Sequence, residues 1–301
     1  MKKRVFFIVA FSILSMQYIY SQSTTDAYMM KKGLFCNLIN YNYTYFNKYW
    51  EGNLLRNNEN LGKVESHTLS YMFNYGLTNK LNVMATINYS SNSASVAYLD
   101  NQKGFQDVGL FIKYNPYTKF VKNGFFDFFA IVGASIPTQK YNVEIQPLSL
   151  GLGSKNVYGE AIANFTHKTG LYATAVCGFT YKSDVELYKD AIIYKDKYYY
   201  TNMAPVQNTL DYSISAGYTQ DDFRAVLKFE QSFGLDGDDI RYNEAPQVTN
   251  QMEYQKIGVF SKYYFNNRLA VEGETQYTLN GRNIGKSISY NLGISYVIGK
   301  F

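Results

Sequence analysis

Apolar and polar residues alternate one by one over several segments of this chain. In residues 81–91 an apolar residue occupies almost every odd position, and in residues 210–218 and 288–298 every even position. Successive side chains of a strand point to opposite faces, whereas a helix would distribute both sets around its axis. The pattern therefore predicts β-strands that present one face to lipid and the other to water.

The same reading along the whole chain predicts twelve strands. They cover residues 33–47, 63–75, 81–91, 105–115, 125–136, 157–166, 171–182, 208–218, 223–233, 251–264, 269–279 and 287–300. No segment after the N-terminal region has the ~18 uninterrupted apolar residues of a membrane helix. Because every backbone amide must be paired in hydrocarbon, the strands predict an all-β fold, a transmembrane antiparallel up-and-down β-barrel. A soluble all-β sandwich is the alternative.

The connections between these strands alternate in length. Short turns are predicted at residues 76–80, 115–124, 167–170, 219–222 and 266–268. Long loops are predicted at 48–62, 92–104, 137–156, 183–207 and 234–250, with a shorter one at 280–286. Outer-membrane barrels have short periplasmic turns and long extracellular loops, so this order places both termini in the periplasm. All five prolines fall in connections or at strand ends, as their missing amide hydrogen requires: Pro116, Pro137, Pro147, Pro205 and Pro246.

The two ends of the chain suggest export to the bacterial outer membrane. Lys2, Lys3 and Arg4 precede an apolar run that leads to Ser21, a pattern typical of a signal peptide. We expect residues 1–21 to be cleaved and residues 22–301 to form the barrel. Phe301 is a terminal aromatic of the kind that the barrel assembly machinery recognises, although it lies on the odd phase, opposite the apolar residues of the last strand.

Composition excludes several function classes. Without residues 1–21 the basic residues fall from 29 to 26 against 24 acidic ones, a net charge of +2, which does not favour a nucleic-acid partner. Cys36 and Cys177 are far apart and show no metal-ligand spacing. No cofactor is indicated. The 31 Tyr and 21 Phe favour an aromatic girdle at the membrane interface, near the tight turns.

A block from Tyr75 to Gly153 carries a family resemblance. Its motifs are YGLTNKL, GFQDVGLFIKY, GASIPT and GLGS. The matching positions are Gly104, Phe105, Asp107, Val108, Gly133, Pro137, Thr138, Gly151 and Gly153. In these residues the chain resembles the outer-membrane barrels named after the meta pathway of phenol degradation. The resemblance implies a transporter-like barrel.

An enzymatic role is not expected. Outer-membrane phospholipases, the enzyme alternative, use a serine and a histidine on one strand, but neither His67 nor His167 has that spacing to a serine. Ten charged residues fall on the water-facing phase and are predicted to line the lumen: Asp107, Lys113, Glu160, Lys182, Arg224, Lys228, Glu230, Lys256, Glu272 and Glu274. Their mixed signs argue against strong ion selectivity. Residues 22–32 are too few for a substantial plug domain.

Two functions remain open. The leading hypothesis is passive passage of small molecules, including partly apolar ones, across the outer membrane. The alternative is a non-conducting barrel whose long loops bind a partner or a surface glycan, because the 183–207 loop holds Tyr188, Tyr194, Tyr198, Tyr199 and Tyr200. Those tyrosines could stack on sugars or simply pack within the loop.

Overall fold

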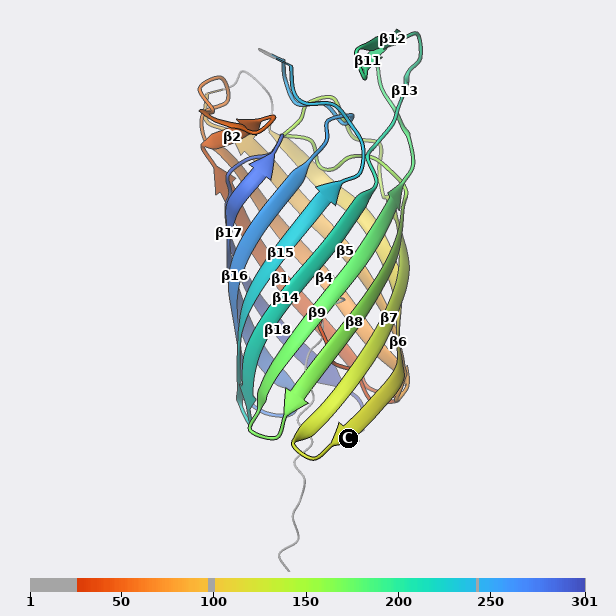
Figure 1. The fold of residues 1–301 in the computed structure, drawn as a ribbon, viewed down its shortest axis with the longest axis vertical. Helices are drawn as coiled ribbons and strands as arrows, with labels where there is room; N and C mark the ends of the chain where they lie inside the picture. Colours follow the sequence, from red (N-terminus) through yellow and green to blue (C-terminus); the bar gives the residue numbers. More distant parts are fainter. Residues whose placement is uncertain (1–25, 97–100, 242–243, 301) are drawn as a thin grey trace, which may run out of the picture.

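Twelve antiparallel strands close into one barrel (Figure 1). The computed structural model describes residues 26–96, 101–241 and 244–300. The barrel strands are β1 (Phe35–Phe46), β4 (Val64–Thr78), β5 (Leu81–Ala94), β6 (Gln102–Val121), β7 (Gly124–Pro137), β8 (Asn156–His167), β9 (Leu171–Lys182), β14 (Thr209–Gln220), β15 (Phe223–Gly234), β16 (Glu253–Tyr264), β17 (Leu269–Arg282) and β18 (Ile288–Ile298). Each strand pairs with the next in the chain, and β1 pairs with β18 to close the barrel. The predicted up-and-down barrel is confirmed, and the soluble sandwich is wrong.

Short and long connections lie at opposite ends of the barrel (Figure 1). We call these the turn end and the loop end. The loop end also carries three small hairpins inside connections predicted as plain loops: β2 (Lys48–Glu51) with β3 (Leu54–Asn57), β10 (Val185–Glu186) with β13 (Met203–Ala204), and β11 (Ile192–Tyr194) with β12 (Lys197–Tyr199). Which end faces the periplasm stays a prediction.

The outer surface of the barrel is apolar, as the alternation predicts. Ile214 and Leu292 point outward, and the two residues are 60% and 69% exposed. Ser90 and Ser213 have the opposite phase, face the inside of the barrel and are buried. An apolar exterior of this extent suits acyl chains and not water. Among the residues that the structure describes, no helix has the length and apolar character needed to cross a membrane.

The turn predicted at residues 115–124 is wrong. Strand β6 continues to Val121 and pairs with β7 down to Gly124, which leaves only residues 122–123 in the turn. Pro116 lies in this extension, where β6 has passed its last pair with β5, Leu81↔Tyr114. The β7 register also shifts between Tyr114 and Tyr117. An edge position beside a bulge tolerates the missing amide hydrogen of proline.

Two predictions concern residues outside the described ranges. The signal peptide at residues 1–21 and the terminal Phe301 both lie there. They stay predictions.

Candidate functional site: the barrel lumen

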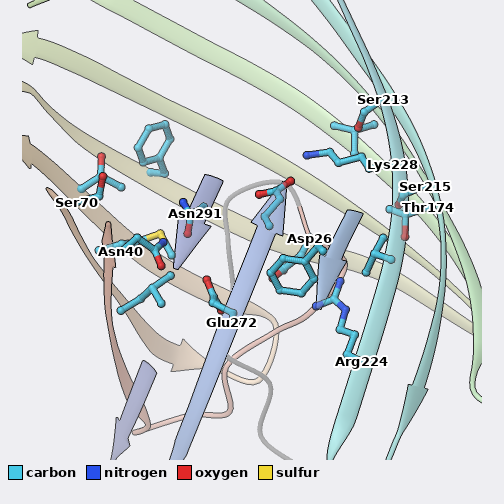
Figure 2. A pocket seen from close by; sticks show the side chains of 18 of the residues that line it. Asp26, Asn40, Ser70, Thr174, Ser213, Ser215, Arg224, Lys228, Glu272 and Asn291 are labelled. Carbon is cyan, nitrogen blue, oxygen red and sulfur yellow. The ribbon is translucent and has the colours of Figure 1, made fainter. Parts of the chain in front are cut away.

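The inside of the barrel has two walls of different chemistry, which β6 and β7 separate on one side. The charged wall comprises β8, β9, β14, β15, β16 and β17, and the neutral wall comprises β18, β1, β4 and β5. Figure 2 shows the division: Asn40, Ser70 and Asn291 lie on one side of the lumen, and Arg224 and Lys228 on the other.

All ten predicted lumen residues lie on the inward phase of their strands. Eight belong to the charged wall: Glu160, Lys182, Arg224, Lys228, Glu230, Lys256, Glu272 and Glu274. Asp107 and Lys113 lie on β6, beyond the neutral wall. Their role in permeation stays a prediction.

Two pairs of opposite charges lie inside the lumen on the charged wall. Lys228 contacts Glu230 along β15. Lys262 Nζ lies 2.6 Å from a Glu272 carboxylate oxygen across β16 and β17. Lys262 was not among the predicted lumen residues, although it shares the inward phase of Lys256. Because these two ammonium groups each contact a carboxylate, their charges are locally balanced, and the wall carries both signs.

Asp26 provides a partner that no periodic pattern could indicate. Lys113 is fully buried, and its ammonium lies 2.9 Å from Asp26 Oδ1. It also donates to the Asp26 carbonyl. A buried ammonium would be costly without such a partner. The pair joins the N-terminal segment, residues 26–33, to the barrel wall.

Arg224 holds the same segment from β15. Its Nε donates to the Tyr172 hydroxyl at 2.6 Å, and its guanidinium lies 4.4 Å from the centre of the Tyr28 ring. Ala27 and Met29, on either side of Tyr28, pack on an inward apolar cluster of β7 and β8. Packing on the ring combines cation–π attraction with burial of the tyrosine.

At its other end the N-terminal segment is fixed beside the turn between β4 and β5. The Gly33 amide donates to the Gly76 carbonyl at 2.8 Å, and the Lys32 amide donates to Asn79 Oδ1 at 3.0 Å. A side chain at position 76 would collide with the Lys31 carbonyl, 2.1 Å away, so only glycine permits this approach. The segment therefore crosses the lumen at the turn end. Asp26 lines the central cavity, so the segment takes up part of the lumen. The expectation that residues 22–32 form no plug domain stays a prediction, because residues 22–25 lie outside the described ranges.

The neutral wall presents amides and hydroxyls in register. On the inward positions of β18, β1, β4 and β5, all of which are described, no side chain is charged. The strand pairing aligns these residues into rows that run across neighbouring strands. The polar rows are Ser289–Thr44–Ser66–Asn92, Asn291–Asn42–Thr68–Ser90 and Gly293–Asn40–Ser70–Asn88.

A central cavity of about 450 Å³ lies between the two walls (Figure 2). Its lining includes neutral polar residues, charged residues and six apolar side chains from six strands. The apolar ones are Leu38, Met72, Phe111, Val176, Val226 and Phe260. A second cavity of about 470 Å³ lies toward the loop end and shares Val176 and Ser213 with the first, so the two adjoin.

One long loop covers part of the lumen at the loop end. Asn92 Nδ2 on β5 donates to the carbonyls of Leu148 and Ser149 at 3.1 and 2.9 Å. The Tyr141 hydroxyl donates to Asp107 Oδ1 at 3.0 Å. Burial and the neighbouring carboxylate raise the pKa of Tyr141 above its ordinary value, so this hydroxyl remains a donor well above neutral pH. Asp107 thus anchors the 138–155 connection as well as facing inward.

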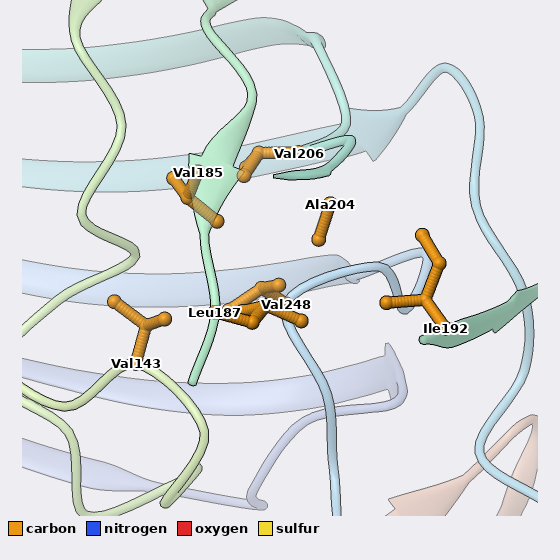
Figure 3. Packing of buried hydrophobic residues seen from close by; sticks show 7 residues of the cluster. All are labelled: Val143, Val185, Leu187, Ile192, Ala204, Val206 and Val248. Carbon is orange, nitrogen blue, oxygen red and sulfur yellow. The ribbon is translucent and has the colours of Figure 1, made fainter. Parts of the chain in front are cut away.

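Three loops share an apolar core above the barrel (Figure 3). Its members come from the connections after β7, β9 and β15: Val143, Val185, Leu187, Ile192, Ala204, Val206 and Val248. Partly buried Tyr194 packs against this core, whereas Tyr200 is 88% exposed and Tyr198 60%. Tyr194 therefore packs within the loop, whereas Tyr198 on β12 and Tyr200 after it do not.

Comparison with known proteins identifies the fold. Neither a family model nor a curated protein sequence matches the chain. Among solved structures it is similar to an outer membrane channel from Pseudomonas putida F1, with a TM-score of 0.73 and 15% identity over 93% of this chain and 100% of that one. The NanC porin is similar with a TM-score of 0.50 and 10% identity over 86% of this chain and 98% of that one. At these identities the similarity shows the outer-membrane barrel fold, and membership of the phenol-degradation family is not confirmed.

Proposed function

We propose that this protein is a channel of the bacterial outer membrane through which small molecules, including partly apolar ones, diffuse passively. The observation that carries the proposal is the central cavity, whose lining combines amides and hydroxyls with apolar side chains from six strands. Such a lining offers hydrogen bonds to one edge of a solute and dispersion contacts to another. The adjoining cavity extends this space toward the loop end.

The histidines support a channel more than an enzyme. His67 points out of the barrel, and its Nδ1 lies 2.7 Å from the Tyr41 hydroxyl. His167 ends β8 and contacts Thr169 in the following turn. Neither imidazole adjoins the central cavity or the second one. A hydrolytic base would have to reach a nucleophile and a bound substrate.

Conductance across a planar bilayer tests the proposal. We expect stepwise currents from refolded protein in potassium chloride, and partial block of these currents by permeating solutes. Folding is checked beforehand by the shift in gel mobility on heating that barrels show. Folded protein that inserts and carries no current would overturn the proposal.

Labelling in intact cells tests the proposed location and orientation. In a background without Cys36 and Cys177, a cysteine at exposed Tyr200 should react with an impermeant maleimide. A cysteine at Asp221, in the turn between β14 and β15, should react only after the outer membrane is permeabilised. The reverse result would place the loop end in the periplasm.

A second candidate function is recognition by the β11–β12 hairpin. The hairpin is held in place, since the Lys195 amide donates to Asp238 Oδ2 at 2.7 Å and its ammonium pairs with Asp236 at 2.8 Å. Tyr198 and Tyr200 lie edge to face, 5.1 Å apart, on its exposed side. Rigid exposed aromatics favour stacking on a sugar or a partner surface. Loss of cell-surface glycan binding on Tyr198→Ala with Tyr200→Ala would support this function.

A further inference from the structure

We propose that the channel prefers uncharged solutes that carry several hydroxyl groups, such as sugars and polyols, and that the neutral wall is the surface that selects them. The inference rests on the proposed channel function and names its solute class. It is drawn from the contrast between the neutral wall and the charged wall.

The neutral wall forms a continuous hydrogen-bonding surface. Two of its polar rows cross four strands and the third crosses three, and neighbouring strands lie about 4.8 Å apart. Asn, Ser and Thr each donate and accept hydrogen bonds. A solute hydroxyl also donates and accepts, so it can replace its hydrogen bonds to water by hydrogen bonds to the wall in many orientations. It can do so at successive positions along the lumen, so desolvation costs the solute little free energy at each step.

Part of this surface is available to a solute. Asn40 lines the central cavity beside Ser70, Asn88 and Asn291. Its amide oxygen is buried against Gly293 on β18, where a side chain would lie 1.8 Å from that oxygen. Elsewhere wall groups bond to each other, as Thr68 does to Ser90 at 2.6 Å, and keep free lone pairs.

The charged wall offers little to an ion. Lys228 and Lys262 already face Glu230 and Glu272, and Lys256 interacts with Glu230 and Glu274. A permeating anion or cation must give up hydration, and it would have to break an ion pair to gain a counter-charge from Lys228, Lys262, Glu230 or Glu272. A neutral solute avoids both costs. The opposite signs also repel either kind of ion at some point along the wall.

The apolar side chains of the cavity can contact the C–H face of sugars and cyclic polyols. Phe111, Met72 and Phe260 lie in the same cavity as the polar rows. Sugars and cyclic polyols present C–H groups on one ring face and hydroxyls around the edge. Aromatic and thioether side chains can contact the C–H face while the edge bonds to the neutral wall.

Tracer flux from proteoliposomes tests the inference. Radiolabelled glucose, gluconate and glucosamine share a carbon skeleton and differ in charge, at mildly acidic pH where glucosamine is protonated. Potassium chloride on both sides balances their charge. We expect glucose to leave at least about fivefold faster than either ion, the factor that one net hydrogen bond supplies.

Matched variants then locate the selecting surface. Asn40→Leu with Ser70→Ala removes polar groups from the neutral wall, and Thr174→Val with Ser215→Ala removes them from the charged wall of the same cavity. The first pair should abolish the preference for glucose, and the second should leave it. Each variant is first checked for folding by heat-modified gel mobility and for potassium chloride current.

The outcomes separate this inference from the channel function. Ion current together with gluconate or glucosamine flux equal to that of glucose would overturn the solute class and leave the channel intact. Equal effects of the two variant pairs would overturn the role of the neutral wall. Absence of both current and flux in the folded wild-type protein would overturn the channel itself.

Discussion

The neutral wall and the charged wall are built by the same strand geometry and differ only in their inward residues. The neutral wall, on β18, β1, β4 and β5, places Asn, Ser and Thr in rows that need no external partner. On the charged wall, Arg224 also holds the N-terminal segment through Tyr28. Lys262 and Glu272 on the same wall pair with each other. A closed barrel can therefore keep an apolar exterior while one side of its interior carries uncharged polar residues and the other carries charged residues held in ion pairs and cation–π contacts.

Removing the ion pair that anchors the N-terminal segment should lower the stability of the protein more than any other change considered. Asp26→Ala leaves the fully buried Lys113 without its carboxylate and should lower the free energy of unfolding by about 3 kcal/mol or more. The freed segment should also raise single-channel conductance. Urea unfolding followed by tryptophan fluorescence and bilayer recording measure the two effects.

A double variant separates the loss of stability from the rise in conductance. Asp26→Ala with Lys113→Met removes both charges, so stability should recover while conductance stays high. Conductance that returned to the wild-type level would show that the pair does not hold the segment in the passage.

Charge placed on the two faces of one strand should give the next largest effect. Leu292→Lys buries an ammonium against acyl chains at a cost of about 2–4 kcal/mol near the midplane. Asn291→Lys, one position earlier, faces the lumen cavity and should cost much less. Equal shifts in the unfolding midpoint would contradict the assignment of inside and outside on β18.

Removing single charges from the charged wall should change ion selectivity without a large change in stability. Lys228→Gln frees Glu230 and should raise the cation-to-anion permeability ratio at least about twofold, because wall charges set the local counter-ion concentration. Glu230→Gln should shift the ratio the other way, and Asn42→Gln on the neutral wall should leave it unchanged. Reversal potentials in a salt gradient report all three, and shifts of one sign for both charge variants would refute the pairing.

Acidification should cause the smallest loss of stability, and this loss should be confined to the loop end. Hydrogen bonds from Arg282 and Asn283 hold the pKa of Asp239 below its ordinary value. Their stabilisation is therefore present above about pH 4, the ordinary value, and is lost as pH falls through the lowered one. Exposure to solvent limits it to under about 1 kcal/mol.

Hydrogen exchange can test the role of Asp239 at this end of the barrel. After correction for the intrinsic pH dependence of exchange, acid should increase exchange around Asp239 in the wild-type protein. Asp239→Asn should remove this increase. A pH dependence that survived in that variant would assign it to another group.

The sequence determined the strands and their inward phase. A period of two assigns every residue of a strand to one face, so Glu272 and Glu274 could be placed inside before any contact was known. It also determined which connections are short, since turns follow directly from the spacing of the strands. Pro116 shows where prediction from the sequence fails. Local propensity predicts that the strand ends there. The proline is tolerated because β6 extends beyond its last pair with β5 and is an edge strand at this point.

Only the tertiary structure decided what faces what across the lumen. Closure of β1 on β18 joins residues from both ends of the chain into the neutral wall, as in the pair Asn42↔Asn291. Asp26 reaches Lys113 from a segment without any periodicity. Periodicity carries information about neighbours along a strand, whereas contacts across a barrel depend on register, closure and chain path, which no local pattern encodes.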